Sequence, residues 1–215
     1  TIKVVTKDIG EVEGSGTDTA TTGTVESGVV TGNITWGTVT WSGGKASVTV
    51  TPKAGYYIQY QVGGTSGTWT PGTTAGGAVT ISEITNGQTV YVRLADGPGA
   101  NANVGQHTSL LIKDTTPPTV EVTITGKTTN SITASVTSSD GQTGMVASPT
   151  YTFYVKETSA GDGTYTQVQT GTGTTATATG LKQNTNYTIK VVTKDIGEVE
   201  GSGTDEETTG TVESG

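Results

Sequence analysis

The first 28 residues of this chain return almost unchanged as its last 28, so that residues 1–28 align with residues 188–215. Both copies begin TIKVVTKDIGEVEGSGTD. The copies differ at two positions, Thr19 and Ala20, which become Glu206 and Glu207. Near-identity over such a length indicates an internal repeat. We therefore expect a tandem array with a unit of about 187 residues, long enough for one large or two small domains.

The residue types between the turns point to strands. Thr, Val, Ile and Tyr alternate in short runs that are separated by Gly, Asn, Asp and Ser, and no stretch of a dozen residues shows helical apolar spacing. β-Branched and aromatic side chains fit a pleated, half-buried surface, and short runs of this kind are typical of sandwiches and barrels. A Thr- and Gly-rich disordered stalk is the alternative, but the apolar alternation is too regular for it. The fold class predicted is all-β.

Paired prolines mark a domain junction. The stretch KDTTPPTVEV contains Pro117 and Pro118, which fix the backbone φ angle and lack the amide hydrogens that a strand ladder needs. We therefore place a boundary after residue 114. The predicted organisation is 1–28 as terminal strands of a preceding or neighbouring-chain sandwich, 29–114 as an immunoglobulin-like domain and 115–215 as a second sandwich. Each repeat then holds two immunoglobulin-like β-sandwich domains.

Apolar residues alternate along residues 115–215 with a period of two, so each strand has one buried and one exposed face. We expect six such strands and a last one near residues 204–212. Seven short strands in about 90 residues is the count of an immunoglobulin-like sandwich. The inward positions predicted are Val120, Val122, Ile124, Ile132, Ala134, Val136, Tyr151, Phe153, Val155, Tyr165, Val168, Leu181, Tyr187, Ile189 and Val191.

The stretch GLKQNTNYTIKVVTKD resembles the signature of fibronectin type III domains, in which a Leu precedes a loop and a Tyr six residues later opens the next strand. Leu181 and Tyr187 hold these positions. The resemblance covers about residues 115–205, and it implies a tyrosine corner, in which the Tyr187 hydroxyl bonds to backbone upstream of it. The family usually has a Trp in its second strand, whereas SITASVT has none. A bacterial immunoglobulin-like relative therefore stays an alternative.

Residues 29–114 contain further alternating runs. Two of them, YQVGGTSGTWTP and TVYVRLAD, resemble repeats of large bacterial surface proteins. The alternation predicts that Val90, Val92 and Leu94 point inward, while Tyr91 and Arg93 do not. Because this domain has little Leu or Phe, we expect some of its Trp residues to be core.

Residues 1–28 correspond to the last strands of the second domain, and an isolated two-stranded unit is marginal in water. They must therefore complete another copy of that domain. Either the chain is a window into a longer polypeptide, or a neighbouring chain takes these strands by strand addition. We favour the window, since residues 188–215 already fill the slot within the chain. Both interpretations make copies of the chain partners in a linear array or filament, and the predicted contact residues are Ile2, Val4, Val12 and Val25.

Charge and residue counts exclude several classes of function. The net charge is −8 and only 11 residues are basic, so no footprint for nucleic acid exists. The chain contains no run of 18 apolar residues, so we expect no membrane insertion in this segment. Cysteine is absent, which excludes disulfides and thiolate metal sites. A single histidine, His107, supports neither a metal pair nor a Ser–His–acid arrangement, so we expect no enzyme and no catalytic residue.

Acidic residues near the predicted junction are the metal candidates. Calcium prefers several hard oxygen ligands, and Asp195, Glu198 and Glu200 follow the sixth strand, where Asp114 could join them. The plain alternative is a polar loop that faces water. We expect no cofactor unless these residues bind calcium.

Four aromatic residues are the candidates for ligand binding, namely Trp36, Trp41, Tyr57 and Trp69. Such side chains can stack on sugar rings, which suggests environmental or host glycans as partners. The function we predict is a structural building block of an extracellular fibre or adhesin stalk at a cell surface, made of tandem sandwiches that strands shared between neighbouring units can complete. The alternative is a carbohydrate-binding accessory module of a larger secreted enzyme.

Overall fold

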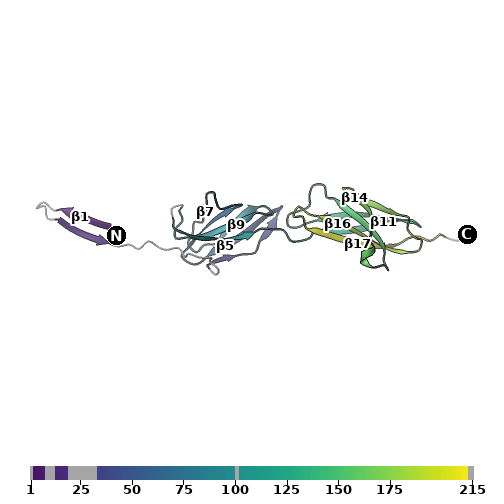
Figure 1. The fold of residues 1–215 in the computed structure, drawn as a ribbon, viewed down its shortest axis with the longest axis horizontal. Coiled ribbons are helices and arrows are strands. Elements are labelled where there is room, and N and C mark those ends of the chain that lie inside the picture. Colours follow the sequence, from purple (N-terminus) through teal and green to yellow (C-terminus); the bar gives the residue numbers. More distant parts are fainter. Residues whose placement is uncertain (1, 8–12, 19–32, 100–101, 213–215) are drawn as a thin grey trace. The chain divides into compact units, whose positions relative to one another are not determined.

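A computed structural model shows a chain whose regular secondary structure, in the residues described, is almost entirely β-strand (Figure 1). The structure describes residues 2–7, 13–18, 33–99 and 102–212, and for the first two ranges it describes the backbone alone. One short 3-10 helix, η1 (Asp162–Thr164), is the only helical element among these residues. The predicted all-β class with sandwich-like domains is confirmed.

Residues 34–111 contribute two four-stranded sheets. The first consists of β3 (Ile34–Trp36), β5 (Lys45–Pro52) and β4 (Thr40–Ser42), with β8 (Val79–Ile84) paired to β5. The second runs in the order β10 (Val104–Leu111), β9 (Thr89–Ala95), β6 (Tyr57–Val62) and β7 (Thr70–Pro71).

The alternation predicted for β9 is confirmed. Val90, Val92 and Leu94 are fully buried, whereas Tyr91 and Arg93 are partly exposed. The expectation that some Trp would be core was wrong, because all three Trp residues are only half-buried. The buried side chains of these sheets are mostly Ile, Val and Leu, whose branched shapes fill a thin interior without the polar atom of an indole. They include Ile34, Val48, Val50, Ile58, Ile81 and Ile84, and Ile112, which follows β10, is buried as well.

Residues 119–208 contribute two further sheets, one of three strands and one of four. The first runs β11 (Thr119–Lys127), β12 (Ser131–Ser139) and β15 (Thr175–Thr179). The second runs β14 (Thr166–Gly171), β13 (Tyr151–Glu157), β16 (Asn186–Lys194) and β17 (Glu200–Thr208). This is the three-plus-four arrangement of an immunoglobulin-like sandwich.

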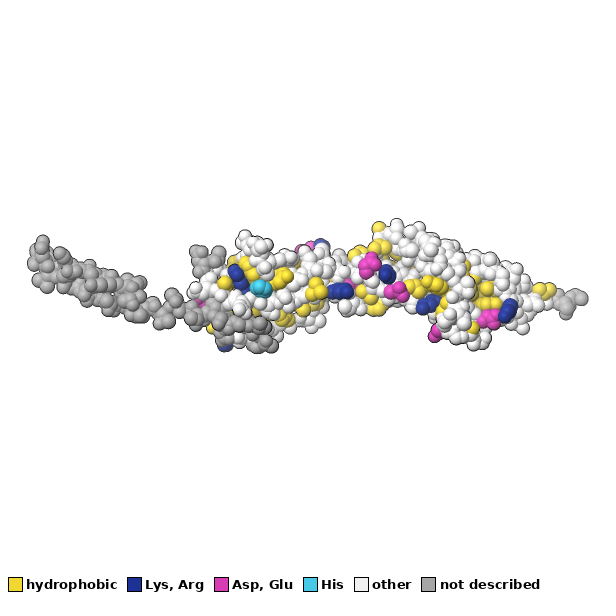
Figure 2. All heavy atoms as spheres, in the orientation of Figure 1, with side chains coloured by type: hydrophobic (Ala, Val, Ile, Leu, Met, Phe, Trp, Pro, Cys, Tyr) yellow, Lys and Arg dark blue, Asp and Glu magenta, His cyan; other side chains and the backbone are white. Residues whose placement is uncertain are grey.

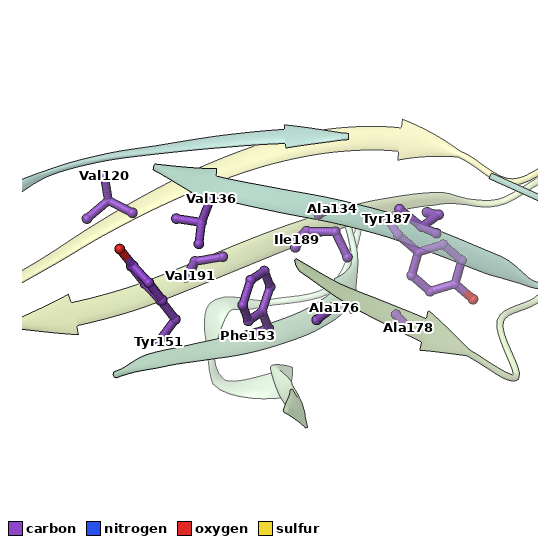
Figure 3. Packing of buried hydrophobic residues seen from close by; sticks show 11 residues of the cluster. Val120, Ala134, Val136, Tyr151, Phe153, Ala176, Ala178, Tyr187, Ile189 and Val191 are labelled. Atoms are coloured by element: carbon purple, nitrogen blue, oxygen red, sulfur yellow. The ribbon is translucent and has the colours of Figure 1, made fainter. Parts of the chain in front are cut away.

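The core of this sandwich forms from the inner faces of both sheets, as Figure 3 shows. Phe153 lies near its centre with neighbours such as Val191 and Ala176 around it. Most of the predicted inward positions are buried or packed against this core. Tyr165 is the exception, because its ring lies beside Tyr154 and under the ammonium group of Lys156, outside the core.

The predicted tyrosine corner is confirmed. Tyr187 is 5% exposed, and its hydroxyl oxygen accepts a hydrogen bond of 2.9 Å from the backbone amide of Lys182. The bond joins the loop before β16 to the ring that opens this strand. It satisfies a polar atom that would otherwise be buried without a partner.

Glycines let the edges of the two sheets approach each other. Gly201 and Gly203 lie in β17, and a β-carbon at either position would overlap the carbonyl oxygen of Pro118 or Val120. Asp205 of the same strand accepts a hydrogen bond from the backbone amide of Ile124 in β11 (2.9 Å). The last strand starts at residue 200, earlier than the predicted 204, because these glycines belong to the strand and allow the neighbouring backbone to approach it.

The N-terminal segment forms a separate two-stranded antiparallel sheet, β1 (Ile2–Lys7) with β2 (Glu13–Asp18). Its register pairs Ile2 with Asp18 and continues to Lys7 opposite Glu13. Every one of these pairs recurs in β16–β17, shifted by 187 residues. The repeated sequence therefore adopts the same hairpin in both copies.

By compactness, the described chain outside this hairpin divides into two units. One holds residues 33–36, 50–79 and 91–109, and the other holds residues 37–49, 80–90 and 110–212. The predicted domain boundary after residue 114 stays a prediction. All contacts of Asp114 described below fall inside the second unit.

The tyrosine corner can be tested by replacing Tyr187 with Phe. The variant keeps the ring but removes the hydroxyl acceptor, so we expect it to lower the free energy of unfolding by about 1 kcal/mol, measured by urea denaturation. Tyr165→Phe is the control, since the ring of Tyr165 makes its contacts, and we expect a change within about 0.5 kcal/mol. Equal losses in both variants would contradict a specific role for the corner.

Candidate metal centre

Three aspartates from separate parts of the chain come together in the second unit. Asp114 follows β10, Asp140 follows β12 and Asp195 follows β16. One carboxylate oxygen of each lies within 4.8 Å of the others. Asp114 is 0% exposed and Asp195 is 1% exposed, while Asp140 is half-buried.

Backbone and hydroxyl groups hold Asp114 firmly. Its Oδ1 accepts a hydrogen bond from the amide of Thr116, and its Oδ2 accepts one from the amide of Thr143 (3.0 Å) and one from the Thr143 hydroxyl. Its own amide donates to Oδ1 of Asn86, in the turn between β8 and β9. Residues 112–118, which join β10 to β11 and are called the linker below, are thereby fixed at Asp114 by several hydrogen bonds.

Thr143 connects the linker to two loops of the sandwich. Its hydroxyl donates to Asp114 and accepts a hydrogen bond from the amide of Gly197 at 3.0 Å, in the β16–β17 loop. A β-carbon on Gly197 would lie 2.8 Å from the β-carbon of Asp114. Glycine is therefore the residue that fits this close approach.

Two carboxylate oxygens in this cluster are buried and have no hydrogen-bond partner. They are Oδ2 of Asp195 and Oδ1 of Asp140. The other oxygen of each carboxylate is satisfied, because Asp195 Oδ1 accepts from the amide of Val199 and Asp140 Oδ2 accepts from the amides of Gln142 and Gly144. Oε1 of Gln142 is a further buried oxygen without a partner. A buried acceptor without a partner is costly, so each such group calls for an explanation.

The electrostatics of the cluster are unfavourable for three free anions. Burial raises the pKa of Asp195, and the charges of Asp114 and Asp140 raise it further. Burial also acts to raise the pKa of Asp114, but hydrogen bonds from Thr143 and Thr116 outweigh it and hold that pKa below its ordinary value. The ion pairs found among the described residues all lie elsewhere, at Lys127–Glu207, Lys156–Asp162, Lys182–Glu157 and Lys194–Glu198.

An arrangement of this kind suits a hard cation. Carboxylate oxygens that converge within a few ångströms are ligands for Ca²⁺ or Mg²⁺, whereas Zn²⁺ and softer metals prefer nitrogen and sulfur. The cluster consists of three carboxylates and contains no histidine. It thus offers negative charge and oxygen ligands.

The structure brings together only two of the four calcium candidates that the sequence suggested. Asp114 and Asp195 belong to the cluster, but Glu198 and Glu200 lie outside it, on the wall of a neighbouring surface pocket of about 350 Å³. Asp140 was missed. It lies in SSDGQTG, which has the composition of a turn, and nothing in its spacing connects it with residues far away in sequence.

The four aromatic candidates are all half-buried. Trp69 packs under the guanidinium group of Arg93, 4.1 Å from the ring centre, and beside the exposed His107. Arg93 also donates two hydrogen bonds to Oε1 of Gln59. Figure 2 shows the histidine among hydrophobic and basic side chains on this face. The ring face of Trp69 that Arg93 covers is therefore not free for stacking on a sugar.

Two of the four predicted subunit contacts, Ile2 and Val4, belong to β1. Val12 and Val25 fall outside the described residues, and for Ile2 and Val4 the backbone alone is described. No helix in the described parts of the chain is long and apolar enough to cross a membrane.

Comparisons with known proteins find likeness among solved structures. No family model matches the chain, and no curated protein matches it. Among solved structures, the chain is similar to a two-domain fibronectin type III segment of chicken tenascin, with a TM-score of 0.47 and 15% identity. The alignment covers 82% of this chain and 97% of the tenascin segment. Our assignment of β-sandwiches rests on the strand pairing described above.

The link through Thr143 can be tested by Thr143→Val. Valine keeps the shape but loses the hydroxyl that donates to Asp114 and accepts from Gly197. We expect the free energy of unfolding to fall by about 2 kcal/mol, because two buried polar groups lose a partner. Thr143→Ser, which keeps the hydroxyl, should recover most of this loss in guanidinium denaturation. A Ser variant as unstable as the Val variant would mean that packing of the methyl group decides stability there.

Proposed function

We propose that this chain is a structural building block of an extracellular fibre or adhesin stalk, made of tandem β-sandwich domains at a cell surface. The observation that carries the proposal is the equivalence of the two hairpins. The β1–β2 hairpin keeps the register of β16–β17 pair by pair, and β16–β17 completes a sandwich. A segment with the same sequence and register is suited to complete another sandwich of the same kind.

The burial of side chains in β16 indicates which apolar residues of β1 require a partner sheet. Ile189 and Val191, the counterparts of Ile2 and Val4, are buried at 2% and 0% exposure in the sandwich core. In water, each such side chain would lose about 1.5–3 kcal/mol of burial free energy. The apolar residues of the hairpin therefore favour a partner sheet.

Two glycines of β2 also indicate that another strand packs closely against its backbone. Gly14 and Gly16 of β2 are the counterparts of Gly201 and Gly203, which admit the backbone of β11. Glycine within a strand weakens it unless another backbone approaches closely. Their presence in the hairpin suggests that a strand equivalent to β11 lies against β2 in the assembled protein.

The source of that partner sandwich is a second copy of the repeat. Within the chain, β16 already pairs with β13 and β17, so the slot is filled covalently. The sheet of β1 and β2 contains no third strand among the described residues. We favour a preceding repeat in one continuous polypeptide, and strand exchange between chains is the alternative.

The surface is compatible with a soluble, repetitive spacer. Charged side chains are scattered over the face in Figure 2 and gather in no large basic patch there. The net charge of −8 acts against nonspecific association of copies.

The proposal can be tested by adding the missing strands. Residues 115–187 are joined in front of Thr1, which restores the order Tyr187–Thr1 that matches Tyr187–Thr188 in the chain. We expect this longer chain to gain a third folded sandwich. Calorimetry should show about 60–80 kcal/mol of additional unfolding enthalpy, and the amides of residues 2–18 should become protected from hydrogen exchange.

The matched control is the same longer chain with Gly14→Val and Gly16→Val. The two added side chains would collide with carbonyls at the positions of Pro118 and Val120, so the extra enthalpy and the protection should be lost. If the unmodified longer chain gains neither, the hairpin is not the end of a sandwich, and the proposal is wrong. The fibre role has a test of its own. If it holds, electron microscopy of longer arrays of the repeat should show filaments with a regular axial repeat.

A further inference from the structure

We propose that Asp114, Asp140 and Asp195 bind one Ca²⁺ ion, which fastens the linker segment at Asp114 to the β12–β13 and β16–β17 loops. The three aspartates alone carry this proposal, which does not depend on the fibre role. The three side chains each present an oxygen within 4.8 Å of the others.

The strongest evidence for a cation site comes from Asp195. Its side chain is 1% exposed, yet its Oδ2 is buried and has no hydrogen-bond partner in the protein. Oδ1 of Asp140 is in the same situation. An ionised carboxylate removed from water needs a counter-charge or several donors, and no described Lys or Arg forms an ion pair with the cluster.

The remaining hydrogen bonds hold the ligands in place. Backbone amides hold the second oxygen of Asp140 and of Asp195, which leaves the unpartnered oxygen of each residue fixed in position. Asp114 is held by Thr116 and Thr143. Its Oδ2 accepts two hydrogen bonds from Thr143, so the oxygen that offers a lone pair to a cation is Oδ1, which accepts one from the amide of Thr116. The ligands are therefore oriented before the ion arrives.

Calcium fits this set better than other common ions. The ligands are hard oxygens, which disfavours zinc and copper. Magnesium demands near-ideal octahedral geometry and keeps several of its waters, whereas calcium accepts six to eight oxygens in a flexible arrangement. Three aspartates with a combined charge of −3 also favour a divalent ion over a monovalent one, since only the divalent ion offsets most of the repulsion. Waters would complete the coordination on the side of the half-buried Asp140.

Calcium at this position would act on the linker. Asp114 lies three residues before Pro117, and its amide is already bonded to Asn86. Binding would therefore tie the turn between β8 and β9, the linker and two loops of the sandwich to one point. Extracellular calcium modules bind with dissociation constants of about 10⁻⁴–10⁻³ M, and we expect an affinity in that range.

The test uses the full chain and four proteins: the unmodified chain, Asp195→Asn, Asp140→Asn and Glu198→Gln. Glu198→Gln is the matched control, because it removes a carboxylate from the same loop as Asp195 but outside the cluster. Each protein is freed of divalent ions with EDTA, dialysed and titrated with CaCl₂ and with MgCl₂ by calorimetry. Thermal unfolding is then followed with and without about 5 mM of each ion, above the range of dissociation constants expected.

We expect one Ca²⁺ per chain and a rise in melting temperature for the unmodified chain and for Glu198→Gln. The two Asn variants should bind at least about tenfold more weakly, since each loses a charged ligand. Without metal, Asp195→Asn should be as stable as the unmodified chain or more stable, because it removes a buried negative charge. If Asp195 had a purely structural role, Asp195→Asn would instead lower the stability of the chain both with and without calcium.

Three results would overturn the proposal. They are absence of binding heat and of any melting shift with calcium, equal binding by Asp195→Asn and the unmodified chain, and magnesium binding as tight as calcium binding. If Asp195→Asn fails to fold, Asp140→Asn decides the question, because the half-buried Asp140 tolerates the change more easily. None of these results bears on the added sandwich of the longer chain, so the two proposals can fail separately.

Discussion

The close approach of β11 and β17 is the constraint on which the rest of the sandwich depends. Two glycines in β17 remove the β-carbons that would otherwise strike the carbonyls of Pro118 and Val120. Asp205 then reaches the amide of Ile124. This contact brings the open edges of the two sheets together, so that the side chains between them form one core. Because the same glycines recur in β2, the constraint also links the fold to the repeat.

The aspartate cluster shows a different principle, in which local hydrogen bonds oppose electrostatics. Amides and the Thr143 hydroxyl hold three carboxylates close to one another at the end of the sandwich. Three like charges in a site shielded from water repel each other strongly unless a proton or a cation intervenes. The backbone geometry therefore concentrates negative charge that no described Lys or Arg neutralises through an ion pair.

The sequence predicted much of the fold because strands carry their pattern locally. Alternation identified the inner face of β9, and the spacing of Leu181 and Tyr187 identified the tyrosine corner. The errors arose where residues serve a distant partner. The last strand was predicted to start near residue 204, after Gly201 and Gly203, and Tyr165 was placed in the core although two lysines and Tyr154 surround it. Two aspartates of the candidate site, Asp114 and Asp195, were predicted from the sequence, whereas nothing in the sequence indicated Asp140.

By itself, the sequence determined the strand-rich class, the period of the repeat and the inward positions of most strands, because these follow from side chains that are neighbours in the chain. Only the tertiary structure decided which carboxylates meet, which glycines admit another backbone and which aromatic rings are covered. Those features join residues as far apart as Asp114 and Asp195. Such meetings depend on how the sheets stack and where the loops end, and no spacing along the chain encodes them.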